Sequence, residues 1–262
     1  MELAYTLLDP TGNRTVLVKT PVPAERQPAL ALALMAAEPA AEQVGFLSPG
    51  GADADIALRM AGGEFCGNAA MCAAAVRAEE KRTAEADLLV RVSGARLPVP
   101  VRVRLQSDGS RLCEARFPEH PIPELAVLPL NGETRRFSLV RFGGIAHLIL
   151  PGDLDRALAE HAAPDWCAFL GAEALGCMLF DEDAGRLTPL VFVPGAQTLC
   201  WERSCASGSA AVGAFLAWKR GAAVEADLAQ PGGILHVSAD PVGEIRLRGV
   251  VKPMKVGKIT VK

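Results

Sequence analysis

Two cysteines stand where loops of small and polar residues pass into helical patterns. Cys66 follows Gly62–Phe65 (GGEF) and precedes an alanine-rich run, and Cys205 lies in the segment 203–208 (RSCASG). At a helix N-terminus a thiol meets free backbone N–H groups and the positive end of the dipole, which lowers its pKa from about 8.5 toward neutrality. Both cysteines are therefore candidates for a base or a nucleophile.

Two equivalent acid–base groups suit racemisation of an amino acid. One thiolate removes the Cα proton from one face while the thiol opposite returns a proton to the other, and the roles exchange in the reverse direction. Two helix N-termini aimed at the carboxylate would stabilise the charge that develops there. A single site of this kind would instead suggest a hydrolase-like nucleophile or a redox thiol.

The other five cysteines are predicted to pack in the core; they are Cys72, Cys113, Cys167, Cys177 and Cys200. Neither CxxC pairs nor metal-finger spacings occur, and the four histidines show no paired spacing, so no metal is expected. The N-terminus lacks the basic and apolar regions of a signal peptide. A reducing cytoplasm with free thiols is the expected setting.

Composition limits the partners. The 262 residues carry a net charge of −3 and contain no run of Lys or Arg longer than two, which argues against nucleic acid or an anionic membrane. No apolar stretch approaches the roughly 18 residues that a membrane span needs. The expected partner is a small molecule.

The elements that would position the cysteines form one plan used twice: strands, cysteine loop, helix, strands. Helices are expected from Asn68 to about Lys81 and from Ser207 to about Arg220, with Asn68 and Ser207 as N-caps, and further helices near 29–37 and 154–170. The proline-rich stretch 118–129 marks a boundary. We expect one domain over 1–122, to which a strand at 250–262 returns, and a second over 123–249.

At these residues the chain resembles the diaminopimelate epimerase superfamily of cofactor-independent racemases. The matching segments are Thr11–Asn13, Glu42–Gly45, Cys66–Asn68, His147 and Cys205–Gly208. The resemblance implies an α+β fold of two pseudo-symmetric domains, each a β-barrel-like antiparallel sheet wrapped around a central helix, with the active site in the cleft between them. It also implies an enzyme without a cofactor, and a homodimer.

The histidine racemase branch, which supplies D-histidine for metallophores, is the closer resemblance. It is carried by Gly63–Ala69, Met178–Glu182, the compact turn Trp201–Cys205 and Gln230–Gly233. In diaminopimelate epimerase the Glu-Arg pair lies several residues before the second cysteine, and an Asn-Pro pair precedes the histidine. Here Glu202-Arg203 adjoins Ser204-Cys205, and Ile145-Ala146 precedes His147. The implied substrate is histidine.

The resemblance assigns roles residue by residue. Cys66 and Cys205 would be the two bases, Glu202 would bind the ammonium group, and Glu42 the imidazole, if it is not simply a solvated loop carboxylate. The groups expected to hold the amino acid are Asn13, Gln43, Gly67, Asn68, Ala206 and Ser207, joined by His147 unless that histidine is structural. Ala206 replaces the family's usual glycine and requires a negative φ. Trp201 would be pocket wall or core, and the role of Arg203 stays open.

Three other interpretations remain at this point. Diaminopimelate epimerase itself and a proline-type racemase share the superfamily and its two cysteines. A non-catalytic thiol protein, acting as a redox sensor or metal binder, belongs to a different class. Exchange of the Cα proton of an amino acid would separate the racemases from the thiol protein.

Overall fold

The computed structural model describes residues 1–117 and 119–260. It divides into two compact units, one made of Met1–Pro118 with Arg248–Lys262 and the other of Glu119–Leu247. The sequence placed the corresponding boundaries after residues 122 and 249. Pro118, at the start of the predicted linker, and residues 261 and 262, at the end of the predicted last strand, lie outside the described residues.

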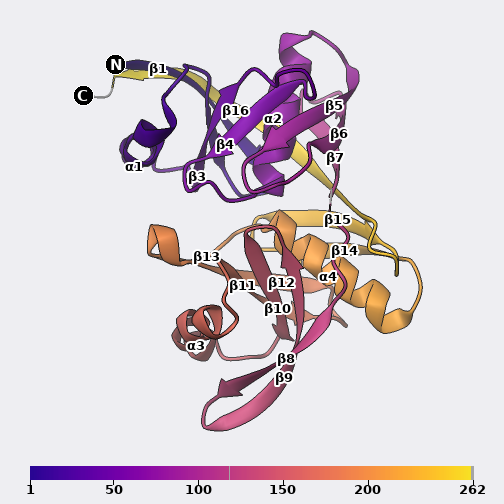
Figure 1. The fold of residues 1–262 in the computed structure, drawn as a ribbon. Helices are drawn as coiled ribbons and strands as arrows, with labels where there is room; N and C mark the ends of the chain where they lie inside the picture. Colours follow the sequence, from indigo (N-terminus) through magenta and orange to yellow (C-terminus); the bar gives the residue numbers. More distant parts are fainter. Residues whose placement is uncertain (118, 261–262) are drawn as a thin grey trace. The chain divides into compact units, whose positions relative to one another are not determined.

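The first unit is a closed barrel of eight strands among the described residues. Their order is β1-β2-β3-β4-β5-β6-β7-β16, and β16 pairs back onto β1 (Figure 1). The strands are β1 (Glu2–Pro10), β2 (Thr15–Val18), β3 (Gln43–Ser48), β4 (Ile56–Met60), β5 (Glu85–Val92), β6 (Val99–Leu105), β7 (Arg111–Arg116) and β16 (Ile245–Thr260). The return of the C-terminal segment is what closes this barrel.

The second unit repeats the arrangement. Its sheet runs β15-β14-β12-β11-β10-β9-β8, with β13 added on β12, and it begins beside the first residues of β16. The strands are β8 (Glu124–Leu130), β9 (Glu133–Phe142), β10 (Ile145–Pro151), β11 (Leu175–Asp181), β12 (Arg186–Val193), β13 (Thr198–Trp201), β14 (Val224–Gln230) and β15 (Gly233–Ala239). β8 is therefore an edge strand of its sheet.

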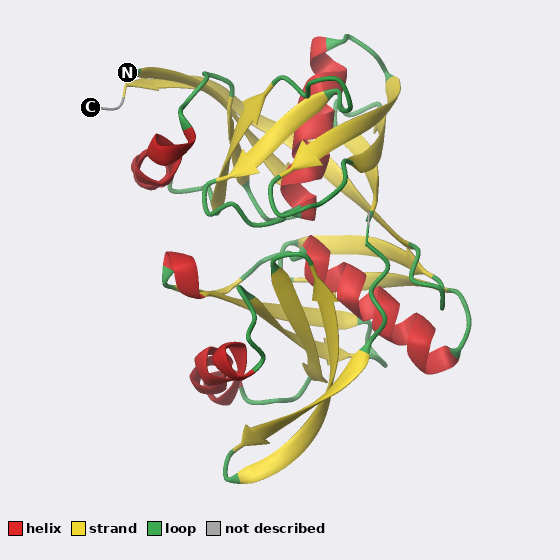
Figure 2. Cartoon of the chain, in the orientation of Figure 1, coloured by secondary structure: helices red, strands yellow, loops and turns green. Residues whose placement is uncertain are grey.

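Each unit carries one helix inside its sheet and one outside. The inner helices are α2 (Gly67–Glu80) and α4 (Ala206–Arg220), the outer ones α1 (Gln27–Ala37) and α3 (Arg156–Phe169), and short 3₁₀ turns lie at Ala24–Arg26 and Pro194–Ala196. Figure 2 shows α2 and α4 running among the strands of their own unit. Small residues dominate both inner helices, because strands surround them closely and bury all but their last turns.

The sheets are mixed, whereas the sequence predicted antiparallel pairing. β2–β3, β4–β5, β10–β11 and β12–β14 are parallel, and the helices α1, α2, α3 and α4 respectively lie between the members of these pairs along the chain. A parallel pair needs such a crossover, and each helix provides one. The same series of pairings in both units confirms the predicted pseudo-symmetry and the α+β class.

Two further differences from the sequence prediction have simple causes. Pro129 lies inside β8 rather than in a linker, since an edge strand tolerates a residue without an N–H. The strand expected at 250–262 is part of a longer strand, β16, which starts at Ile245: Ile245–Leu247 belongs to the second unit, and the part from Val251 onward pairs with β1 in the first.

Candidate active site

Cys66 and Cys205 are themselves the N-caps of the two inner helices. Both have extended backbones, with φ/ψ of −138°/110° and −125°/109°, and each Sγ accepts a hydrogen bond at 3.4 Å from the backbone N–H three residues later, on Ala69 and Gly208. The helices therefore start one residue earlier than predicted, and the N-cap assignments of Asn68 and Ser207 are wrong. A thiol takes the capping place that a hydroxyl usually fills.

A chain of hydrogen bonds holds the first cysteine. Sγ of Cys66 donates to Oε1 of Gln43 at 3.3 Å, and Nε2 of Gln43 donates to Oγ1 of Thr15 at 2.7 Å. The Thr15 hydroxyl donates in turn to the backbone carbonyl of Asn13 at 3.0 Å. The bonds thus link Cys66 and Gln43 to the backbone of Asn13 through Thr15, a residue that the sequence analysis missed although it lies two residues after Asn13.

The remaining predicted residues of the first unit flank this chain. Asn13 is buried and follows the turn Thr11-Gly12, in which both residues have positive φ. Glu42 directly precedes β3, and its backbone N–H donates to the carbonyl of Arg14. Gly67 and Asn68 open α2 and are both buried. These residues thus lie on the segments that hold or follow Cys66, and their contact with a substrate stays a prediction.

Cys205 is more deeply buried than Cys66, with 5% of its surface exposed. Burial, and next the nearby Glu202 carboxylate, raise the pKa of the Cys205 thiol well above its usual value, while the Ser207 hydroxyl and the Gly208 N–H act in the opposite direction. The expectation of a pKa near neutrality is wrong for this cysteine, because desolvation outweighs the helix N-terminus. In the free protein Cys205 is a thiol.

The other predicted residues of the second unit adjoin Cys205. Oγ of Ser207 lies 3.6 Å from its Sγ. Ala206 is the first residue of α4 and is not among the residues with positive φ, which confirms the predicted conformation. Glu202 lies three residues before the cysteine, and its backbone N–H donates to the Pro189 carbonyl. These residues thus lie close to Cys205 along the chain.

The backbone of Cys205 has partners that the sequence analysis missed. Its N–H donates to Oε1 of Gln230 at 2.8 Å, and its carbonyl accepts from Oγ of Ser209 at 2.8 Å. Gln230 and Ser209 bond each other at 3.0 Å. The segment 230–233 carries part of the family resemblance, but nothing in its residue types indicates a contact with the cysteine.

His147 lies on the inner face of β10 with no exposed surface. Within the described part of the chain neither ring nitrogen has a hydrogen-bond partner, and Phe142 packs edge-to-face at 5.9 Å. Burial lowers the pKa of His147 to about 3, so the ring is neutral. A Cβ at Gly176 would lie 2.1 Å from its Nδ1. The ring is packed as a core side chain, but its two unpaired nitrogens differ from those of a hydrogen-bonded structural histidine. Contact between His147 and the substrate stays a prediction.

Trp201 packs in the core, whereas the role of the Arg203 side chain stays open. Trp201 packs against the core formed by β8–β12 and α3, with the Arg156 guanidinium 4.8 Å from its ring centroid. Arg203 is exposed, and its carbonyl accepts from the Gly232 N–H at 2.7 Å. For Trp201 the structure thus favours the core over a pocket wall.

Among the remaining five cysteines, four are buried: Cys72, Cys113, Cys167 and Cys177. Burial raises the pKa of Cys113 and Cys177 to about 12, as befits packing residues. Cys200 is exposed on β13, so the packing prediction is wrong for this residue. β13 pairs with β12 and adds only a short extension to the sheet, which leaves the side chain uncovered.

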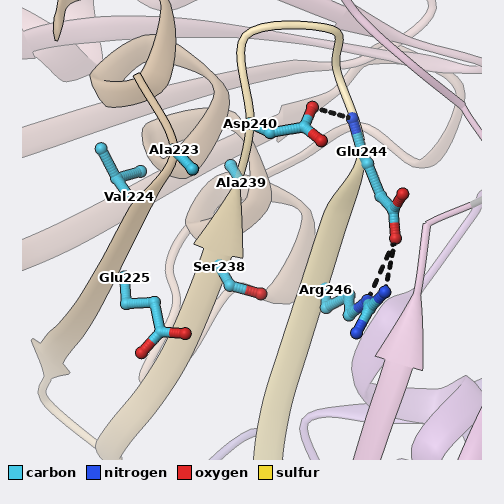
Figure 3. A pocket seen from close by; sticks show the side chains of 8 residues that line it. All are labelled: Ala223, Val224, Glu225, Ser238, Ala239, Asp240, Glu244 and Arg246. Atoms are coloured by element: carbon cyan, nitrogen blue, oxygen red, sulfur yellow. Dashed lines mark hydrogen bonds and ion pairs between the residues drawn. The ribbon is translucent and has the colours of Figure 1, made fainter.

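A groove of about 300 Å³ lies elsewhere on the second unit (Figure 3). It is lined by Ala223, Val224, Glu225, Ser238, Ala239, Asp240, Glu244 and Arg246. Glu244 pairs with Arg246 at 2.7 Å, and Asp240 accepts the Glu244 N–H at 2.9 Å. None of the predicted site residues lines this groove, and two of its polar residues, Asp240 and Glu244, belong to the turn at 240–244.

No helix in the described residues is long and apolar enough to cross a membrane. Within the same residues no cluster of three or more His, Cys, Asp and Glu side chains could hold a metal ion.

The candidate site consists of two half-sites, one per unit, each built on a cysteine-capped helix. That they share one cleft stays a prediction.

The fold is that of known racemases and epimerases. A predicted epimerase from Pseudomonas aeruginosa superposes with a TM-score of 0.73 at 17% identity, covering 99% of this chain and 100% of that one. A hydroxyproline epimerase from Agrobacterium vitis, solved with trans-4-hydroxy-L-proline, superposes with a TM-score of 0.68 at 12% identity, over 98% and 92% of the chains. These likenesses confirm the two-domain fold.

The sequence comparison is more specific. Residues 2–259 match the family described as "Histidine racemase CntK N-terminal domain", and the chain belongs to this family. A histidine racemase of Fusobacterium nucleatum is 30% identical, over 98% of this chain and 96% of the relative. A histidine racemase of Staphylococcus aureus is 28% identical, over 98% and 97%.

Proposed function

We propose that this chain interconverts L- and D-histidine with two cysteines as the acid and the base. The observation that carries the proposal is the pair of thiol N-caps, Cys66 and Cys205, at equivalent places of two structural repeats. A racemase must address both faces of one Cα, and two equivalent acid–base groups meet that requirement. Membership in the histidine racemase family supports both the reaction and the substrate.

In this reaction the two cysteines have complementary roles. One cysteine, as thiolate, takes the Cα proton, and the other, as thiol, delivers its proton to the opposite face, so one proton is removed and one returned. The backbone N–H groups in the first turns of α2 and α4 are suited to hold the substrate carboxylate, whose charge grows as the carbanion forms. Asn13, Gln43, Asn68 and Ser207 supply further polar groups beside the cysteines.

The ammonium group of the substrate is suited to Glu202. This carboxylate raises the pKa of Cys205, so a cation bound to it would cancel part of that effect. Substrate binding would then make Cys205 a stronger acid at the moment when it must act. The position of Glu202 beside Cys205, along with its charge, supports this role.

Histidine selectivity is assigned to Glu42, whose carboxylate can accept a hydrogen bond from the imidazole and favour its protonated form. Glu42→Gln should lower kcat/KM for histidine about tenfold, the loss of one charge-assisted hydrogen bond of about 1.5 kcal/mol. Exchange of a substrate without a basic side chain, such as alanine, should not fall. Equal losses for both amino acids would contradict this assignment.

The test of the reaction is proton exchange. The reduced protein is incubated in D₂O with single L-amino acids, and loss of the Cα proton signal is followed by NMR together with the appearance of the D-enantiomer. Exchange with histidine and not with diaminopimelate or proline is the expected result. Exchange of proline would favour a proline-type racemase, and no exchange of any amino acid would overturn the proposal.

A reducing compartment suits the two required thiols, and we propose the cytoplasm as the place of action. Reversible loss of activity on oxidation, restored by dithiothreitol, is the expected behaviour. A homodimer and a link to metallophore synthesis remain predictions from the resemblance. Light scattering of the purified protein tests the first.

A further inference from the structure

We infer that Gln230 is a positioning residue for Cys205. Its side-chain amide, together with the Ser209 hydroxyl, fixes the backbone of this cysteine and thereby the direction of its thiol. The inference rests on the proposed function, in which Cys205 transfers a proton, and it makes the two half-sites mechanically different.

The contacts form a closed ring. Oε1 of Gln230 accepts the Cys205 N–H at 2.8 Å, Nε2 of Gln230 donates to Oγ of Ser209 at 3.0 Å, and that hydroxyl donates to the Cys205 carbonyl at 2.8 Å. All three residues are buried. Both backbone polar groups of the cysteine are thus held by side chains, one from the end of β14 and one from the first turns of α4.

This ring completes a capping arrangement. In a capping box the N-cap side chain accepts the N–H of the third helical residue, whose own side chain reaches back to the N-cap N–H. Here Sγ of Cys205 accepts the Gly208 N–H, and Gly208 has no side chain to return. Gln230 supplies the missing acceptor from another strand. Its loss would leave a buried N–H without a partner directly at the reacting residue.

The first unit holds its cysteine loop differently. Ser93, directly after β5, accepts the Met60 N–H and donates to the carbonyl of Glu64, both at 2.9 Å. This bond reaches the loop two residues before Cys66 rather than the cysteine itself. The place that Ser209 takes in α4, four residues after the cysteine, is Ala70 in α2. The hydroxyl of Ser209 therefore has no counterpart at the equivalent position of α2.

The decisive variant is Gln230→Met, which keeps the size of the side chain and removes both hydrogen bonds. A misplacement of a reacting group by a fraction of an ångström to one ångström should lower kcat about 10- to 100-fold, with KM little changed. Gln230→Glu retains an acceptor for the Cys205 N–H and should recover much of the rate. Its added charge should shift the activity profile to higher pH. Ser93→Ala is the matched control in the first unit.

Isotope effects give a readout that a merely structural role would not move. kcat/KM is measured with Cα-deuterated L- and D-histidine. When proton transfer at Cys205 slows, the isotope effect should rise for the enantiomer that Cys205 deprotonates and fall for the other. In Ser93→Ala the isotope effects should either stay as in wild type or change in the opposite sense for the two enantiomers. Equal changes for both enantiomers in Gln230→Met would overturn the inference.

A second readout does not require turnover. Iodoacetamide labelling of the free protein, quantified at each cysteine by peptide mass spectrometry, should show a several-fold change at Cys205 in Gln230→Met and none at Cys66. Circular dichroism establishes that the variant is folded. Unchanged labelling of Cys205 in a folded variant overturns the inference even if histidine is not the substrate. If the labelling of Cys205 changes in Gln230→Met but the wild-type protein does not racemise histidine, only the proposed function is refuted.

Discussion

Sγ of Cys66 lies 3.3 Å from Oε1 of Gln43, 23 residues earlier along the chain. The amide orients the thiol, and its own Nε2 is anchored on Thr15 at the start of β2. A parallel pairing, Thr15 with Gln43, brings these two residues together. The sheet, rather than the loop, therefore decides where the first thiol points.

Gln43→Leu removes the acceptor of this bond while keeping most of the side chain's volume. We expect a fall in kcat of about tenfold or more, because an unanchored thiol samples unproductive orientations. Steady-state kinetics by chiral chromatography measures it. Gln27→Leu is the matched control: Gln27 is a buried glutamine of the same unit that bonds the Val22 carbonyl, away from Cys66. An equal loss in both variants would show only general destabilisation.

Cys66→Ser and Cys205→Ser should each lower racemisation by about 10²- to 10⁴-fold, the usual contribution of a general acid or base. The fold should persist, because serine is a good N-cap and replaces sulfur at the first turns of α2 and α4. Chiral chromatography measures the racemisation rates, and thermal melting measures the stability of each variant. Cys200→Ser, at an exposed position, should retain full activity. Normal activity in either site variant would contradict the two-base assignment.

Glu202→Gln should lower the pKa of the Cys205 thiol. Among the causes that raise this pKa, the charge of the Glu202 carboxylate is second only to burial. The pH at which Cys205 reacts half-maximally with iodoacetamide should therefore move downward. Racemisation should nevertheless fall, since the ammonium group loses its partner. Glu225→Gln, an exposed change on the same unit, serves as control and should leave the labelling profile of Cys205 unchanged.

The burial of His147 in its neutral form should make the stability of the protein depend on pH. Its pKa is about 3 in the folded protein against 6.5 ordinarily, so the unfolded chain binds a proton that the folded one does not between these values. The free energy of unfolding should therefore fall by up to about 1.4 kcal/mol per pH unit as the pH drops from 6.5 toward 3. Urea unfolding of wild type and His147→Leu, compared at pH 7 and pH 5, measures this contribution.

At pH 7 the His147→Leu variant should be more stable than wild type by about 1–3 kcal/mol, because the buried polar ring has no partner among the described residues. Its activity should change little if the ring is a core side chain. Loss of activity with retained stability would instead restore the role in substrate binding that the resemblance suggested.

The sequence by itself determined the repeated plan and the two candidate reactive cysteines. Cys66 and Cys205 stand out locally because glycine, serine and alanine surround them and alanine-rich helices follow. Those helices are short-range features, and their limits were predicted to within about two residues. The N-caps were misassigned because a thiol is an unusual cap, and propensity favours Asn and Ser.

Tertiary structure alone decided the environment of each thiol. Gln230 is 25 residues from Cys205 and Gln43 is 23 from Cys66, so only strand pairing reveals these contacts. The pKa of Cys205 likewise depends on how completely the strands around α4 exclude water, and this burial reversed the shift expected from the helix N-terminus. Burial likewise lowers the pKa of His147 and keeps its ring neutral. Local pattern determines which groups can react, and long-range packing determines how they are held and charged.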